Sequence, residues 1–133
     1  MRGYLFPLLA ACSPAAAPDA QVPGLSGTLV VTNKTPSTAT IIDAASGRAL
    51  ATLPTGNNPH EVVITKDGRT AVVTDYGTGS SPTLTVIDVP GKRVARTISL
   101  GQYTGPHGIA YLPGDSLVIV TSERTNNVVI VAV

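Results

Sequence analysis

The sequence predicts an all-β protein built from antiparallel strands. Charged residues make up only 13% of the chain against 43% hydrophobic residues, and there are 13 glycines and 11 prolines. Valine, threonine and isoleucine recur in short blocks between these turn-forming residues, which is typical of strands joined by tight turns. No segment keeps the apolar period of about 3.6 residues that an amphipathic helix requires. We therefore expect essentially no helix beyond residues 1–26, which we expect to be irregular or weakly helical.

The chain repeats itself at a spacing of 42 to 47 residues. The segment 59–64 (PHEVVI) recurs 47 positions later as 106–111 (PHGIAY). The segment 71–75 (AVVTD) matches 118–122 (VIVTS) at the same spacing, and it matches 29–33 (LVVTN) at a spacing of 42. This period is too long for leucine-rich, ankyrin or tetratricopeptide repeats, and it fits one four-stranded blade of a β-propeller. The predicted fold is therefore a series of consecutive propeller blades.

The predicted strands fill one complete blade and parts of two others. From the innermost strand outward, the central repeat places its strands at 61–65, 70–75, 83–88 and 94–100. The first repeat offers only three outer strands, at 28–33, 38–43 and 49–54. The third repeat offers only three inner strands, at 108–112, 116–122 and 127–133. Together they amount to about two and a half blades of four antiparallel strands.

These repeats resemble those of the YVTN family of β-propeller proteins. The tetrapeptide that names the family has near matches at Val30–Asn33, Val72–Asp75 and Ile119–Ser122. The family's G-x-x-P-H opening is matched by Gly56–His60, and its I-D-x-x-[ST]-G-[KR] turn is matched by Ile42–Arg48. The resemblance covers residues 27–133 and implies a ring that is commonly seven-bladed. We therefore expect this sequence to be C-terminally truncated, and we expect the isolated chain to fold poorly or aggregate.

The N-terminus has the features of an export signal. Residues 1–12 combine a short basic start, an apolar stretch too short to span a bilayer, and Leu9-Ala10-Ala11-Cys12. This tetrapeptide resembles the lipobox of bacterial lipoproteins, in which the cysteine carries lipid. Residues 13–26 then form a flexible Ala/Pro-rich tether, leaving 27–133 as the partial propeller. We expect an exported protein held by Cys12 at the periplasmic or extracytoplasmic face of a membrane. The alternative is an ordinary cleaved signal peptide, or a wrongly placed start codon, with Cys12 incidental.

His60 and His107 occupy equivalent positions just before two predicted innermost strands. If these strands line the channel, both imidazoles lie near one rim, where they could bind a transition metal or a small ligand. The alternative is structural: each ring nitrogen bonds the backbone of the adjacent blade, and the recurrence of histidine in both repeats favours this role. Glu61 follows His60 and is a further candidate ligand, but Gly108 takes its place in the next repeat.

Other polar residues suggest structural roles. Asp43 and Asp88 end strands and are interpreted as turn-forming residues, and Asp75 is expected to make a similar local turn bond. A small basic cluster lies near an outermost strand and is typical of a charged sheet edge that discourages strand addition: Lys92, Arg93 and Arg96.

The favoured function is a non-catalytic scaffold of the cell envelope that binds a small-molecule or protein ligand through its blade loops. The alternative is a propeller enzyme or metalloprotein with channel-lining histidines, similar to reductases or lactonases of this fold class. No cofactor is expected, apart from a transition metal in the full ring. The single cysteine, Cys12, excludes a CxxC motif, and no catalytic serine or zinc-protease motif occurs. Without residues 1–11 the chain carries eight basic and eight acidic residues, so nucleic-acid binding is not expected.

Overall fold

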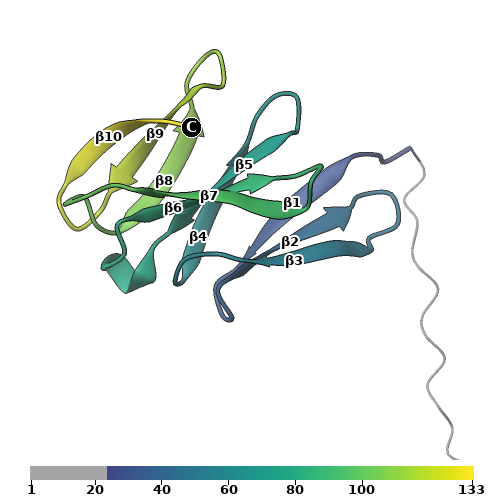
Figure 1. The fold of residues 1–133 in the computed structure, drawn as a ribbon, viewed down its shortest axis with the longest axis horizontal. Helices are drawn as coiled ribbons and strands as arrows, with labels where there is room; N and C mark the ends of the chain where they lie inside the picture. The colour runs from purple at the N-terminus through teal and green to yellow at the C-terminus, as the bar shows by residue number, and fades with distance from the viewer. Residues whose placement is uncertain (1–23) are drawn as a thin grey trace, which may run out of the picture.

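The computed structural model describes residues 24–133, which form ten strands in three antiparallel sheets (Figure 1). The first sheet contains β1 (Thr28–Asn33), β2 (Thr38–Asp43) and β3 (Ala49–Pro54). The second contains β4 (Pro59–Ile64), β5 (Thr70–Asp75), β6 (Thr83–Asp88) and β7 (Arg93–Ser99). The third contains β8 (Pro106–Tyr111), β9 (Leu117–Ser122) and β10 (Asn127–Ala132).

The all-β prediction is confirmed. Within residues 24–133 the single helical element is a 3-10 turn, η1, at Gly77–Gly79. No helix in this part of the chain has the length and apolar character that crossing a bilayer requires. The expected signal segment 1–12, with Cys12, lies outside the described residues, as does most of the expected tether.

The predicted innermost strands were placed two residues late. β4 and β8 begin at Pro59 and Pro106, so His60 and His107 are strand residues and do not precede the strands. Proline fits the first position of a strand because the missing N–H is not needed for the ladder there. Both prolines are buried and pair with the last residues of the adjacent strands, Asp75 and Ser122.

The strands in each sheet follow chain order, and neighbouring sheets pack face to face. The innermost strand β4 lies beside both β1 and β8, and the three sheets fan out from this region (Figure 1). This arrangement brings the second residues of β4 and β8 close together, although 47 positions separate them in the sequence.

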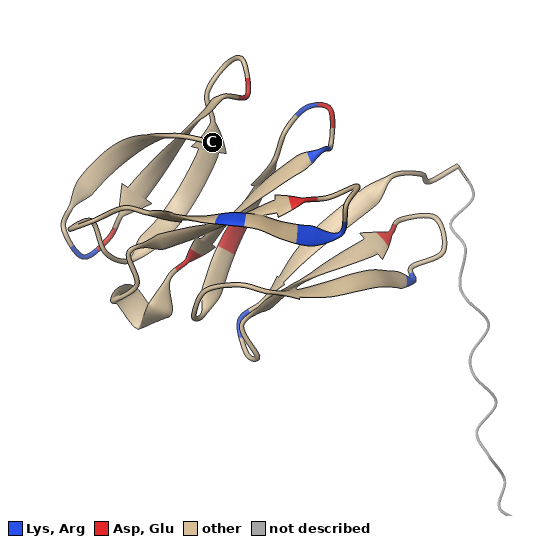
Figure 2. Cartoon of the chain, viewed as in Figure 1, with Lys and Arg blue, Asp and Glu red and all other residues tan. Residues whose placement is uncertain are grey.

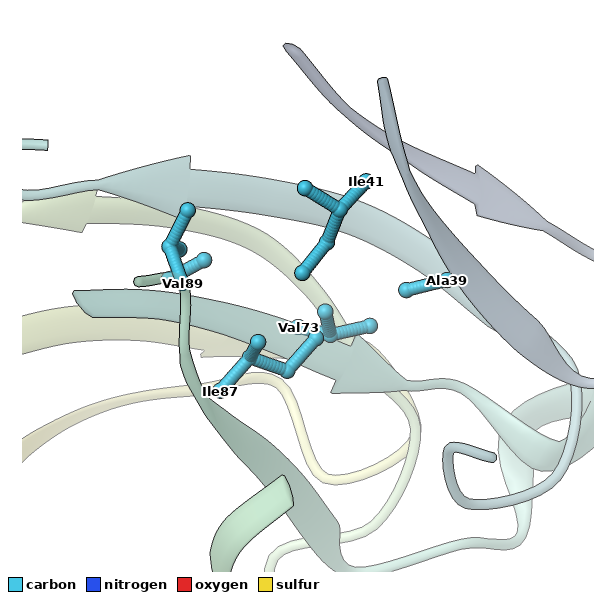
Figure 3. Packing of buried hydrophobic residues seen from close by; sticks show 6 residues of the cluster. Ala39, Ile41, Val73, Ile87 and Val89 are labelled. Atoms are coloured by element: carbon cyan, nitrogen blue, oxygen red, sulfur yellow. The ribbon is translucent and has the colours of Figure 1, made fainter. Parts of the chain in front are cut away.

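The hydrophobic core consists of two clusters, one on each face of the second sheet. Strand β5 contributes to both, because its alternating side chains point in opposite directions. The cluster against the first sheet comprises Ala39, Ile41, Ala71, Val73, Ile87 and Val89 (Figure 3). The cluster against the third sheet comprises Val72, Leu84, Val86, Leu100, Val118 and Val120. Each fully buried valine, leucine or isoleucine contributes roughly 1.5–3 kcal/mol to folding, so the central sheet is the best-supported part of the described chain.

The outer sheets present apolar side chains on strands with a single hydrogen-bonded neighbour. Among residues 24–133, β1 pairs only with β2, and β10 pairs only with β9. Leu29 on β1 is 52% exposed, and Val128 and Ile130 on β10 are 63% and 59% exposed. In a complete propeller ring, such exposed apolar side chains pack against further blades.

Two of the three aspartates at strand ends form the expected turns. Asp43 accepts hydrogen bonds from the backbone N–H and the hydroxyl of Ser46, and these bonds lower the pKa of its carboxyl group. Asp88 accepts one from the N–H of Gly91 at 3.0 Å. Its Oδ2 atom also pairs with Arg93 Nη2 at 2.7 Å. Arg93 begins the exposed strand β7, so part of the expected basic cluster lies on that strand (Figure 2).

Asp75 differs from this expectation. Its side chain is fully buried, and its bonds reach distant residues instead of closing a local turn. The carboxylate accepts hydrogen bonds from the hydroxyls of Thr83 and Thr85 on β6 and from the backbone N–H of Gly56, which precedes β4. Burial raises its pKa in spite of these donors. The same position in the first repeat, Asn33, donates to the equivalent pair of threonines, so this residue type bonds adjacent strands in both repeats.

Candidate functional site

A β-bulge in each of the two innermost strands positions the histidines. The register of β4 against β5 shifts between Pro59 and Val62, and that of β8 against β9 shifts between Pro106 and Ile109. A bulge sets two residues opposite one and redirects the side chains at that point. The redirected pairs are His60 with Glu61 and His107 with Gly108.

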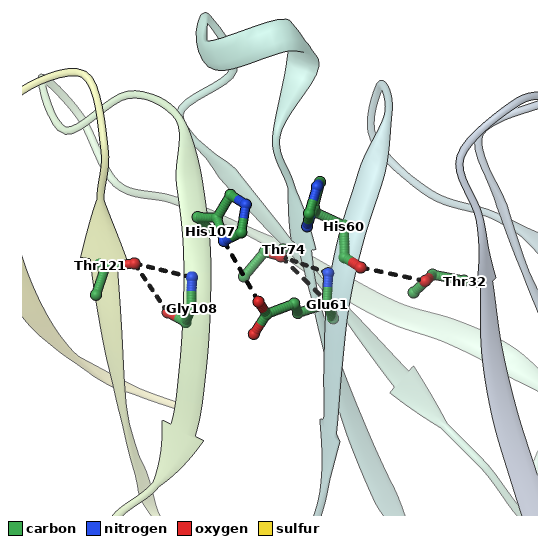
Figure 4. Close-up of polar contacts among 7 residues, drawn as sticks. All are labelled: Thr32, His60, Glu61, Thr74, His107, Gly108 and Thr121. Atoms are coloured by element: carbon green, nitrogen blue, oxygen red, sulfur yellow. Dashed lines mark hydrogen bonds and ion pairs between the residues drawn. The ribbon is translucent and has the colours of Figure 1, made fainter.

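Equivalent threonines hold the two bulges. Thr74 Oγ1 accepts a hydrogen bond from the N–H of Glu61 at 2.9 Å, and Thr121 Oγ1 accepts one from the N–H of Gly108 at 2.8 Å (Figure 4). The third equivalent threonine, Thr32, donates to the carbonyl oxygen of His60 at 3.4 Å and so connects the first sheet to β4. Backbone and threonine atoms therefore fix the bulges without using the imidazoles.

The two imidazole rings lie side by side between β4 and β8 (Figure 4). The ring centroids of His60 and His107 are 4.0 Å apart, with an angle of 40° between the ring planes. Tyr76, which directly follows β5, contacts both rings at centroid distances of 5.4 Å and 5.5 Å. The three rings form one aromatic group contributed by two sheets.

Glu61 and His107 form a contact between sheets. His107 Nδ1 is 3.3 Å from Glu61 Oε1, and the side chains are 36% and 43% exposed. Without a bound ion, a carboxylate at Nδ1 favours a proton on that nitrogen, and a metal ion bound between the two atoms would replace that proton. The pair is thus accessible from solvent, and its orientation is constrained.

One ring nitrogen of His60 is shielded from solvent. Its Nδ1 atom is buried and has no hydrogen-bond partner among the described residues. Burial is the main cause that lowers the pKa of His60, and the neighbouring His107 adds to this effect. At neutral pH the imidazole of His60 is therefore neutral, which is the form that accepts a proton or binds a metal ion.

The structural alternative for these histidines predicted a bond from each ring nitrogen to the backbone of the adjacent blade. Neither Nδ1 atom makes this bond. The Nδ1 atom of His60 has no partner, and the Nδ1 atom of His107 faces the carboxylate of Glu61. The carboxylate of Glu61, which has no counterpart in the next repeat, contacts the histidine of that repeat.

Sequence reasoning missed a second row of rim residues. Lys34, Tyr76 and Glu123 each follow the YVTN-like tetrapeptide of their repeat. Lys34 Nζ lies 5.9 Å from the centre of the Tyr76 ring. Interaction with the Glu123 carboxylate is the main cause that raises the pKa of Tyr76. The repeat could have revealed these rim residues, because the residue after the tetrapeptide lies at the same rim in each of the three repeats.

Three potential metal ligands converge at this point. His60, Glu61 and His107 each offer one ligand atom, and these atoms lie within 4.8 Å of one another. Two imidazoles and a carboxylate form a donor set that divalent transition metals accept. The arrangement can therefore bind a cation, or a polar ligand through the same atoms.

The sheets are blades of a β-propeller, because each is a meander of antiparallel strands whose innermost member lies beside that of the next. No protein-family model matches the chain, and no curated protein matches it significantly in sequence.

Solved structures are similar in fold. Hydrazine synthase of Kuenenia stuttgartiensis matches with a TM-score of 0.70 and 19% identity over 87% of this chain and 30% of its own. A dihydro-heme d1 dehydrogenase, NirN, in complex with DHE matches with a TM-score of 0.68 and 17% identity over 85% of this chain and 24% of its own. A Bacteroides caccae protein of unknown function matches with a TM-score of 0.58 and 13% identity, over 80% of this chain and 42% of its own. This chain therefore spans under half the length of each.

Proposed function

We propose that this chain belongs to an exported, lipid-anchored β-propeller that binds a ligand at the rim formed by its innermost strands. One observation carries the proposal: the histidines of two repeats meet with Glu61, and neither Nδ1 atom bonds the backbone of the adjacent blade. Threonine hydroxyls hold the bulges in place. Polar side chains that converge without a structural task are the usual mark of a binding site.

The surrounding rim supports selective binding of a polar ligand. Lys34 supplies a positive charge, Glu123 a negative charge and Tyr76 an aromatic face with a hydroxyl. The similar structures include a synthase and a dehydrogenase, so this fold carries reactive sites in other proteins. A fold is compatible with many functions, however, and this rim has no residue set that defines a reaction. A binding scaffold is therefore the function we favour over an enzyme.

The anchoring part of the proposal rests on the sequence. The lipobox-like segment ending at Cys12 and the Ala/Pro-rich residues after it are those of a tethered envelope protein. Lipid on Cys12 would keep the rim at a membrane surface without a membrane-spanning helix.

A ligand screen by thermal unfolding tests the binding part. The midpoint is measured at low micromolar protein for the wild type and for the double variant His60→Gln, His107→Gln, with panels of small organic anions, amines, sugars and divalent cations. A ligand that binds only the folded state raises the midpoint by mass action. We expect at least one ligand class to stabilise the wild type and not the variant. The absence of any stabilising class, or equal stabilisation of both proteins, would contradict the proposal.

A further inference from the structure

We propose that His60, Glu61 and His107 bind one divalent first-row transition metal ion, of the chemical class of Zn²⁺, in a site that two neighbouring blades complete together. The inference rests on the proposed function, because it names the ligand of the same rim. Each blade alone supplies too few ligands: β4 contributes His60 and Glu61, and β8 contributes His107.

The geometry is close to that of a bound ion. Zinc–nitrogen and zinc–oxygen bonds of about 2.0–2.1 Å place neighbouring donor atoms about 3.3 Å apart in a tetrahedron. The separation between His107 Nδ1 and Glu61 Oε1 is 3.3 Å. All three ligand atoms lie within 4.8 Å of one another, a spread that small side-chain rotations can close.

The unpartnered nitrogen of His60 is a second, independent indication. A buried polar atom without a partner costs about 1–3 kcal/mol, and a bound ion is one explanation for such an atom. His60 Nδ1 is such an atom among the described residues. When the imidazole coordinates an ion through one nitrogen, its other nitrogen carries the proton, so coordination fixes the tautomer of His60.

The backbone of the site is held rigidly before any ion binds. Thr74 and Thr121 fix the two bulges through the N–H groups of Glu61 and Gly108. Precise placement of the backbone lowers the entropy that the ligands lose on coordination. The Tyr76 ring contacts both imidazole rings and limits their movement.

The donor types select the class of metal. Imidazole nitrogen and carboxylate oxygen suit Zn²⁺, Cu²⁺, Ni²⁺ and Fe²⁺, whereas Mg²⁺ and Ca²⁺ prefer sites made only of oxygen. Three protein ligands leave coordination positions open, and the exposed side of His107 and Glu61 gives solvent access to them. The ion would therefore present a position for a small anionic or neutral donor ligand at the rim.

Isothermal titration of the full chain with ZnCl₂ tests the site, with MgCl₂ as the comparison ion. The wild type should bind one Zn²⁺ per chain and no Mg²⁺. His60→Gln and His107→Gln should each weaken Zn²⁺ binding at least about tenfold, and Glu61→Gln should do the same. Asp88→Asn is the control: it removes one negative charge at the end of β6, opposite the first residue of β5 and outside the rim, and it should change the affinity less than about threefold.

Cobalt substitution gives a readout that depends on coordination. Co²⁺ bound by two imidazoles and a carboxylate should show visible absorption bands that His60→Gln and Glu61→Gln lose. Circular dichroism establishes that each variant is folded, and if one is not, the remaining ligand variants carry the test. Absence of Zn²⁺ binding, or equal affinity in His60→Gln and the wild type, overturns the metal site. If a metal-free organic ligand still stabilises only the wild type in the presence of a chelator, the proposed function stands and only this inference fails.

Discussion

His107 Nδ1 lies 3.3 Å from Glu61 Oε1, so a histidine of the third sheet contacts a carboxylate of the second. Glu61 has no acidic counterpart in the next repeat, where Gly108 occupies the equivalent bulge position. The repeated features, bulge and threonine, build the framework of both blades. The departure from the repeat at this bulge position creates the contact, which makes the cluster asymmetric and gives it a chemistry that the framework does not need.

The threonines at the bulges should matter for stability in proportion to their burial. Thr74 is fully buried, so Thr74→Val leaves the N–H of Glu61 without its partner and should lower the free energy of unfolding by about 1–2 kcal/mol. The equivalent Thr121→Val should have a smaller effect, because Thr121 is exposed and water can replace the hydroxyl. Equilibrium denaturation of both variants measures this. Equal losses would contradict the expectation that burial of the hydroxyl sets the size of the effect.

Asp75 should contribute to a pH dependence opposite to that of an ordinary paired carboxylate. Burial raises its folded-state pKa above the ordinary value of an aspartate, so the folded protein holds the proton more tightly than the unfolded chain. Ionisation of this group therefore costs stability as the pH rises through the folded-state pKa. Asp75→Asn removes this cost. The free energy of unfolding of Asp75→Asn minus that of the wild type should therefore be larger at about pH 7 than at about pH 4.

Asp75→Ala is the companion variant. It should lose about 3 kcal/mol at neutral pH, because the N–H of Gly56 and the hydroxyls of Thr83 and Thr85 lose their shared acceptor. Urea denaturation of the wild type and both variants at the two pH values gives these differences. A pH-independent difference between Asp75→Asn and the wild type would contradict a raised pKa.

Cys12 is predicted to carry the lipid anchor. Cys12→Ala should move the protein from the membrane fraction to the soluble fraction, because the variant lacks the thiol that would carry the lipid. Ser13→Ala is the control, since it changes the neighbouring residue and leaves the lipidated cysteine. Immunoblotting of fractionated cells decides the point, and unchanged membrane association of Cys12→Ala refutes lipidation.

The exposed row on β10 should promote association. Val128 is 63% exposed on a strand that has one hydrogen-bonded neighbour in the described chain, and such edges pair with other chains. Val128→Lys should reduce concentration-dependent association, measured by light scattering. Asn127→Lys adds the same charge to the adjacent exposed position without removing apolar surface, and it should reduce association less. Equal effects would indicate that charge alone is responsible.

Much of the fold followed from the sequence, because each strand is a short block of β-branched residues between turn formers and the blocks recur in order. The bulges did not follow, since they arise from threonine hydroxyls that bond the neighbouring strand. The contact between Glu61 and His107 depends on how two sheets pack, and strand periodicity contains no information about that distance. Asp75 looked like a turn residue because its bonding partners, Gly56 and Thr85, are distant in the sequence.

Replacing a buried, unpartnered polar atom of a side chain by carbon distinguishes a side chain that binds a ligand from one that stabilises the fold. We expect the Nδ1 atom of His60 to cost stability, because we assign the imidazole a role in ligand binding and not in holding the fold. His60→Phe keeps an aromatic ring against His107 and Tyr76 and removes that atom. Tyr111→Phe is the matched reference outside the rim, because the Tyr111 hydroxyl is also buried without a partner and burial raises its pKa to about 12.

The most direct test of the central claim is therefore the free energy of unfolding of these two variants, measured in denaturant at low protein concentration without added metal. Both should be more stable than the wild type, by about 1 kcal/mol. If Tyr111→Phe gains stability while His60→Phe loses about 1 kcal/mol or more, His60 holds the blades together. That result would contradict the claim that the rim histidines form a ligand site.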